Sequence, residues 1–232
     1  MVQILGLVLI SFLVTSFIMI PFIDWLFILR ERHIKNGNKN INKKENLAVN
    51  KSTPIHNLLL KGKDIHTPVG GGIPIILVVV TLTVLILILT NHTFDTETYI
   101  LIFTMLAFGF IGFMDDLRKM FVSFSGKYSG IRGRYIFVYQ LFFALLVSLL
   151  LYFPMGINNI FIPVLGNVIL GWLYIPLAVF SIIAFTNAYN ISDGLDGLST
   201  GLLIICLFAF LVLAHTVFDE TLSTFIGIWI GA

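Results

Sequence analysis

The sequence predicts an all-α, polytopic transmembrane helix bundle with six full spans, a truncated seventh, and its N-terminus outside. Three observations lead to this fold class. The 232 residues are 58% hydrophobic and only 11% charged, whereas a soluble domain is about 25% charged, so too few charges are present to cover a water-exposed surface. Apolar runs recur that are long enough for the roughly 20 residues that a helix needs to cross a bilayer. All 14 Lys and Arg residues lie in two segments, 30–63 and 118–134.

The expected spans follow the apolar runs in chain order. The full spans are 2–29, 72–90, 98–114, 135–153, 169–187 and 199–217. A further run begins near residue 221 and stops at Ala232. The first run is long and has no basic residue before it, so we interpret it as a retained span rather than a cleaved signal peptide. Turn residues in segment 154–169 predict a short extracytoplasmic hairpin.

The basic residues predict the orientation, because short cytoplasmic loops collect Lys and Arg. They lie between the first and second spans and between the third and fourth, and the loops on the other side have none. Loops 30–71, 115–134 and 188–198 are therefore expected to face the cytoplasm. We treat residues 1–232 as one integral membrane domain, with 30–71 as a basic loop within it. The single Cys206 excludes a disulfide scaffold.

The first candidate site lies at the inner end of the third span. Gly109 and Gly112 are three residues apart, so a neighbouring helix could approach closely there. If the helix continues, Asp115 and Lys119 share one face, whereas the adjacent Asp116 points in another direction. Carboxylates near a bilayer are costly and usually have a partner or a function. An acidic pair balanced by the basic residues that follow it is an equally good structural interpretation.

The second candidate site is Asn187–Ser199, where Asn, Asp and Gly residues crowd between two apolar spans. Asp193 and Asp196 have no Lys or Arg in this loop. Carboxylates that must stay ionised favour a cation such as Mg²⁺, which takes oxygen ligands and keeps substrate phosphates as co-ligands. The structural alternative is a polar turn in which Ser199 or Asp196 is the helix N-cap.

The third candidate site is Lys63–Pro74, in which three consecutive Gly residues lead into the second span. Basic groups followed by a glycine-rich helix start suit a phosphate or a nucleotide. Gly and Pro also mark ordinary helix entries, so this segment alone favours neither interpretation.

Together the three segments resemble the polyprenyl-phosphate N-acetylhexosamine-1-phosphate transferases of the glycosyltransferase 4 family, and within it the muramoyl-pentapeptide branch. Asp115–Lys119 is similar to an Asp-Asp-x-x-Lys motif of the family. Asn187–Leu198 matches Asn-x-x-Asn-x-x-Asp-Gly-x-Asp-Gly-Leu in full, and Thr67–Gly72 matches Thr-Pro-x-x-Gly-Gly. The resemblance runs from about residue 60 to the end of the chain.

The resemblance implies transfer of phospho-N-acetylmuramoyl-pentapeptide from a UDP-linked donor to undecaprenyl phosphate, giving lipid I and UMP in peptidoglycan synthesis. It implies a Mg²⁺ cofactor, a UDP-sugar, a polyprenyl phosphate and membrane lipid as partners, no nucleic acid, and the homodimers common in the family. The expected location is the bacterial inner membrane, multi-pass, with the active site on the cytoplasmic face. Members of the family have about ten spans, so the chain is expected to be the N-terminal part of such a domain and inactive alone.

The resemblance also implies roles by position. Asp115, Asp116 and Lys119 are the implied catalytic residues, in order a base or nucleophile near the lipid phosphate, a site-shaping carboxylate and a phosphate partner. The implied metal ligands are Asp115, Asp116 and Asp193. The implied substrate-binding residues are Lys63, Thr67, Asn187, Asn190, Gly194, Leu195 and Asp196.

Two alternatives stay open. Lys63 and His66 are similar to the branch that uses simpler UDP-N-acetylhexosamines, so the donor is either that class or the muramoyl-pentapeptide. A transporter or a noncatalytic membrane protein is the second alternative. A transporter would favour acids or broken helices near the bilayer midplane, whereas the candidate acids here lie at one face.

Overall fold

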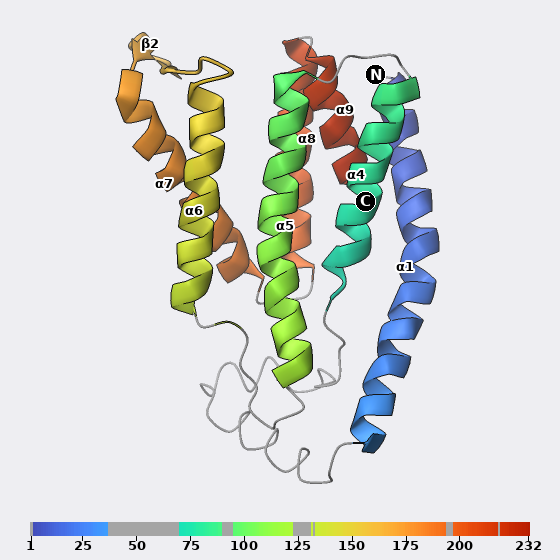
Figure 1. Cartoon of the computed structure of the whole chain (residues 1–232). Helices are drawn as coiled ribbons and strands as arrows, with labels where there is room; N and C mark the ends of the chain where they lie inside the picture. Colours follow the sequence, from blue (N-terminus) through green and yellow to red (C-terminus); the bar gives the residue numbers. More distant parts are fainter. Residues whose placement is uncertain are drawn as a thin grey trace.

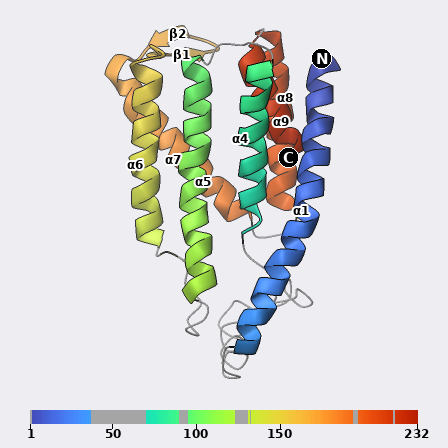
Figure 2. The same ribbon diagram turned by 45° about the vertical axis from the view of Figure 1, so that its right-hand side comes forward.

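The molecule is a bundle of long helices that carries a short hairpin at one end (Figures 1 and 2). The computed structural model describes residues 2–36, 70–89, 95–122, 131, 133–193, 197–217 and 219–232. The helices are α1 (Val2–Asn36), α4 (Gly72–Leu89), α5 (Thr96–Val122), α6 (Gly133–Tyr152), α7 (Tyr174–Ser192), α8 (Leu198–Thr216) and α9 (Glu220–Gly231). The strands are β1 (Asn159–Ile162) and β2 (Gly166–Ile169), followed by a 3₁₀ turn at Gly171–Leu173.

Six of the helices are long and apolar enough to cross a membrane, which confirms the number of full spans. Three spans have different boundaries from those expected. The first continues to Asn36 instead of 29, so the start of the expected loop 30–71 is helical. The third extends to Val122, because the helix continues through the acidic motif. The fifth begins at Tyr174 rather than 169, because the hairpin and the 3₁₀ turn take up the preceding residues, and it continues to Ser192.

The hairpin expected within 154–169 is present, and its loop chemistry explains its geometry. Its strands are antiparallel, with Ile162 opposite Gly166. The Leu165 N–H donates to the Ile162 carbonyl at 3.0 Å, which closes a turn with Pro163 at its second position. Gly166 then has a φ of 75°. A left-handed residue after a turn is the usual form of a three-residue hairpin loop, and glycine adopts it without steric cost.

The buried core lies where α4, α5 and α9 meet. Val79, Met105, Phe225 and Ile228 form its centre. Elsewhere, large apolar side chains face outward. None of the side chains of α7, a helix that the structure describes throughout, is buried, and Phe180 is 71% exposed. Such a surface suits lipid rather than water, so the outward-facing apolar residues agree with the membrane class.

The short helix α9 packs closely along α1, which is the most distant helix in the sequence. Ser11 is fully buried and its Oγ donates to the Ile228 carbonyl at 2.7 Å. A Cβ atom added to Gly227 would lie 3.1 Å from the Cγ2 of Ile4, and one added to Gly231 would overlap the Val8 carbonyl oxygen. Glycines at this spacing let two helix backbones approach.

The close approach expected at Gly109 and Gly112 occurs at one of the two residues. A Cβ atom on Gly109 would lie 2.5 Å from the Cδ1 of Ile76 in α4. At Gly112 the same addition would meet nothing within 4 Å. Gly109 therefore lies at the close contact between α5 and Ile76 of α4, whereas Gly112 takes no part in that contact.

Candidate active site

The described parts of the three candidate motifs lie at the same end of the bundle, opposite the hairpin. The chain reverses direction from one long helix to the next, so the C-terminal ends of α1, α5 and α7 lie beside the N-terminal ends of α4, α6 and α8 (Figures 1 and 2). The acidic motif ends α5, the Asn-rich motif ends α7, and Gly70 leads into α4. The fold thus brings sequence-distant polar segments to one end of an otherwise apolar bundle.

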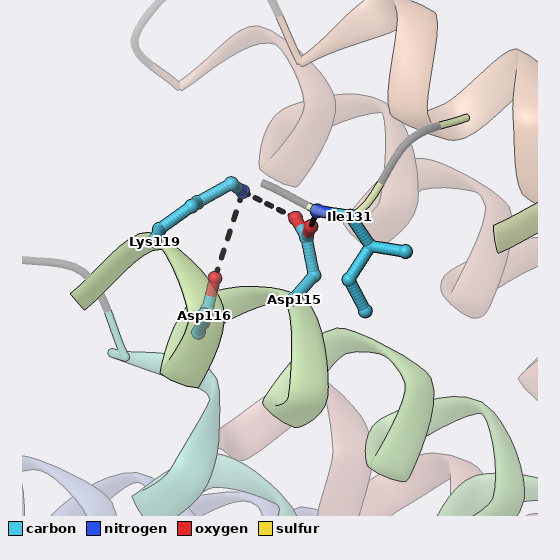
Figure 3. A network of polar contacts seen from close by, with 4 residues as sticks. All are labelled: Asp115, Asp116, Lys119 and Ile131. Atoms are coloured by element: carbon cyan, nitrogen blue, oxygen red, sulfur yellow. Dashed lines mark hydrogen bonds and ion pairs between the residues drawn. The ribbon is translucent and has the colours of Figure 1, made fainter. Parts of the chain in front are cut away.

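A charged cluster forms at the end of α5, where Lys119 contacts both acidic side chains (Figure 3). Its Nζ lies 2.6 Å from Asp115 Oδ2 and 3.7 Å from Asp116 Oδ1. The i, i+4 relation between Asp115 and Lys119 holds because α5 stays helical to Val122. Because Asp116 lies three residues before Lys119 in the same helix, its carboxylate also faces Lys119. One ammonium group therefore contacts both carboxylates.

Asp115 is held more firmly than Asp116. Its other oxygen, Oδ1, accepts a hydrogen bond of 2.7 Å from the backbone N–H of Ile131, just before α6 (Figure 3). Hydrogen bonds to a carboxylate are stronger than those between neutral groups. Asp116 lies beyond hydrogen-bond distance from Lys119, so it keeps more acceptor capacity for a ligand. Asp115 is therefore oriented by protein groups, and Asp116 is more open.

The first residue of the second motif is anchored by a side chain that the sequence did not point to. Asn187 donates from Nδ2 to the Ile183 carbonyl at 2.8 Å and to Gln140 Oε1 of α6 at 3.1 Å. Gln140 is buried, at 6% exposure. The signal that could have found it is a single amide in the apolar run 135–153. Asn190, one turn further along α7, is exposed.

Asp193 follows α7 and is tied to the next helix. Its Oδ1 accepts a 2.7 Å hydrogen bond from the Oγ of Ser199, which is buried. The alternative that Ser199 is an N-cap is wrong, because Gly197 occupies that position with a φ of 79° and Ser199 lies within α8. Asp193 instead has an exposed carboxylate, and the Ser199 hydroxyl orients it.

The remaining predicted residues lie outside the part of the chain that the structure describes: Lys63, Thr67, Gly194, Leu195 and Asp196. Their roles stay predictions. The third motif is described only from Gly70 onward, where Ile73 N–H donates to the Gly70 carbonyl at 3.2 Å.

The donor set at the end of α5 is chemically suited to Mg²⁺. Asp115 and Asp116 provide the carboxylate oxygens that this ion prefers, and Mg²⁺ commonly binds one or two carboxylates together with substrate phosphates. Among the described residues, no three His, Cys, Asp or Glu side chains gather closely enough to hold a metal by themselves. Participation of Asp193 as a third ligand therefore stays a prediction.

Comparison with known proteins gives one family. The family model described as glycosyl transferase family 4 matches residues 98–232. A protein of Syntrophus aciditrophicus is 38% identical over 165 residues, covering 70% of this chain and 44% of the relative. A protein of Aquifex aeolicus is 36% identical over 166 residues, with the same coverage. Both relatives are named phospho-N-acetylmuramoyl-pentapeptide-transferase, and the chain spans less than half their length.

Proposed function

This chain belongs to glycosyl transferase family 4, and from that premise we propose that its protein makes lipid I. In this reaction phospho-N-acetylmuramoyl-pentapeptide passes from its UDP-linked donor to undecaprenyl phosphate, and UMP is released. The names of the relatives support the transferred group, phospho-N-acetylmuramoyl-pentapeptide. The observation that carries the proposal for this chain is the Asp115–Asp116–Lys119 cluster at the end of an apolar helix. A lipid phosphate and a water-soluble nucleotide would meet at such a boundary.

The proposed reaction is a phosphoryl transfer. An oxygen of the lipid phosphate forms a bond to the sugar-linked phosphorus, the bond from that phosphorus to the bridging oxygen breaks, and UMP leaves with this oxygen. In such transfers the protein contributes mainly positioning and electrostatic stabilisation. The work of the site is therefore to bring together anionic groups that repel one another.

The described residues suit this work. Lys119 has three N–H donors and an exposed portion of 37%, so it can bind a phosphate oxygen besides the two carboxylates. Asp115, oriented by Lys119 and Ile131, would take the proton from the lipid phosphate as its oxygen attacks. Asp115 and Asp116 would hold Mg²⁺ together with substrate phosphates, and the bound ion would neutralise phosphate charge. Among the described residues, Asp193 does not gather with them, so it would join them only in the complex with substrate.

The proposal includes the surroundings of the reaction. A multi-pass protein in the bacterial inner membrane, with this end of the bundle facing the cytoplasm, would have access to both substrates. The six apolar helices support the membrane location. The enrichment of Lys and Arg in the sequence segments 30–63 and 118–134, which begin in the C-terminal parts of α1 and α5, supports the cytoplasmic side.

The test is Asp115→Asn in the full-length protein, with lipid I formation measured from UDP-N-acetylmuramoyl-pentapeptide and undecaprenyl phosphate. We expect the rate to fall about 10²- to 10⁴-fold, the usual contribution of a positioned acid or base. Asp24→Asn is the matched control, because Asp24 is exposed on α1 and should leave the rate unchanged. Normal turnover by Asp115→Asn would remove Asp115 from the catalytic residues. Wild-type activity only with UDP-N-acetylhexosamines would favour the alternative donor suggested by Lys63 and His66.

A further inference from the structure

We propose that Gln140 is a positioning residue, whose buried amide orients Asn187 for binding of the UDP-linked donor. This inference rests on the proposed function, because Asn187 is a donor-binding residue only if the transfer occurs. Gln140 lies on α6, which contains none of the residues predicted for the site. Its position is nevertheless the point at which α6 contacts the second motif.

The burial of Gln140 requires an explanation. Its side chain is 6% exposed, within a helix whose neighbouring residues Tyr139 and Leu141 are apolar or aromatic and face outward. A buried amide costs free energy unless its polar atoms are bonded. The described partner is Asn187, which donates to Gln140 Oε1 at 3.1 Å. The buried amide of Gln140 is thus bonded to the first residue of the Asn-rich motif.

The geometry restricts Asn187 at two points. Its Nδ2 bonds to the Ile183 carbonyl on its own helix and to Gln140 on the neighbouring helix. With the nitrogen held from two directions, the amide plane is fixed, and so is the direction of Oδ1. Oδ1 is the atom that can accept a hydrogen bond from an N–H or O–H group of a nucleotide sugar. Loss of the Gln140 contact would leave the amide free to rotate.

The same helix also orients the first motif. Ile131, two residues before α6, donates its N–H to Asp115 at 2.7 Å. Gln140 lies seven residues after Gly133, the first residue of α6, which is about two helical turns along the helix. Ile131, just before α6, therefore contacts the acidic motif of α5, and the second turn of α6 contacts Asn187, the first residue of the Asn-rich motif of α7. Through these two hydrogen bonds α6 sets the relative placement of both motifs.

The test uses two variants of Gln140 in the full-length protein. Gln140→Met keeps the length of the side chain and removes the acceptor, whereas Gln140→Glu keeps an acceptor oxygen. We expect Gln140→Met to raise KM for the UDP donor about tenfold, the factor corresponding to one hydrogen bond. The KM for undecaprenyl phosphate should change less than about twofold, and Gln140→Glu should recover most of the loss. In an Asn187→Ala background, Gln140→Met should have no further effect on the donor KM.

Ser148→Ala is the matched control. Ser148 is fully buried on the same helix, and its hydroxyl bonds to the Ala144 carbonyl of that helix. It should leave both KM values unchanged. Equal changes of kcat and both KM values in Gln140→Met, or effects that add to those of Asn187→Ala, would overturn the positioning role.

A second measurement separates this inference from the proposed function. The thermal unfolding midpoints of Gln140→Met, Asn187→Ala and the double variant in detergent form a cycle that needs no activity. Non-additive midpoints support the contact, and additive ones overturn it. A wild-type protein that transfers nothing would contradict the proposed function alone, since the cycle still decides whether Gln140 holds Asn187.

Discussion

At the scale of single residues, the candidate carboxylates are oriented in two different ways. Asp115 is held by a cation of its own helix and by a backbone N–H from beyond the next loop. Asp193 is held by the hydroxyl of Ser199, across the turn between α7 and α8. A carboxylate that is aimed before a ligand arrives loses less freedom on binding. Both contacts should therefore matter more for binding than for folding.

Ser199→Ala tests this at Asp193. Removing the hydroxyl leaves the carboxylate free to rotate, and if Asp193 binds Mg²⁺ we expect the Mg²⁺ concentration for half-maximal lipid I formation to rise about fivefold, the value of one modest hydrogen bond. The measurement is a Mg²⁺ titration of the full-length enzyme. Ser192→Ala is the control, because the Ser192 hydroxyl bonds to the Ala188 carbonyl of its own helix and not to Asp193 among the described contacts. An unchanged titration curve for Ser199→Ala would argue against a metal role of Asp193.

Sequence reasoning reached the contacts that helix periodicity determines and missed those that depend on packing. The Asp115–Lys119 pair follows from a spacing of four residues and was predicted. The Ile131 and Gln140 contacts depend on where α6 lies relative to α5 and α7, and no local pattern encodes that. Ser199 was noticed, but as an N-cap, because the left-handed turn at Gly197 was not recognised.

At the scale of elements, α4 and α5 are in close contact through Gly109. We expect Gly109→Val to lower the stability of the protein by about 1 kcal/mol, the lower end of the usual cost of overpacking, because its Cβ would displace only the flexible Cδ1 end of Ile76. Gly112→Val is the matched control with open space around it, and it should change stability by much less. Thermal unfolding in detergent measures both. Equal losses for the two variants would show that helix propensity, not the α4–α5 contact, sets the cost.

The helices themselves were largely predictable, and their ends were not. Long apolar runs fix the existence of each span, since hardly any other structure satisfies backbone groups in lipid. The end of α5 was placed too early because charged residues were taken as the end of the helix, although the i, i+4 ion pair supports its continuation. The start of α7 was placed too early because hydropathy does not distinguish the residues Ile169–Leu173, which end β2 and form the 3₁₀ turn, from an α-helix.

At the scale of the whole molecule, the proposed transfer depends on orientation in the membrane, because the acidic cluster must face the side that holds the nucleotide donor. We expect a cysteine at position 164 to react with an impermeant thiol reagent in intact cells, and one at position 118 to react only after permeabilisation. Val164 is 92% exposed at the hairpin loop, and Arg118 is exposed near the other end. A Cys206→Ser background removes the native thiol. The reverse labelling pattern would place Asp115 on the outer side and contradict access to a cytoplasmic nucleotide.

The contact between α1 and α9 has a consequence for how the protein is made. Ser11 and Ile228 are separated by 217 positions, so during synthesis the first helix enters the bilayer long before its partner leaves the ribosome. Until then the side of α1 that includes Ile4, Val8 and Ser11, which α9 later contacts, has only lipid, or a chaperone of the insertion machinery, to cover it. Completion of this helix pair therefore waits until the intervening long helices α4, α5, α6, α7 and α8 and the hairpin have been made. A lesion at Gly231 should appear as rapid degradation of newly made protein, even where the acidic cluster is intact.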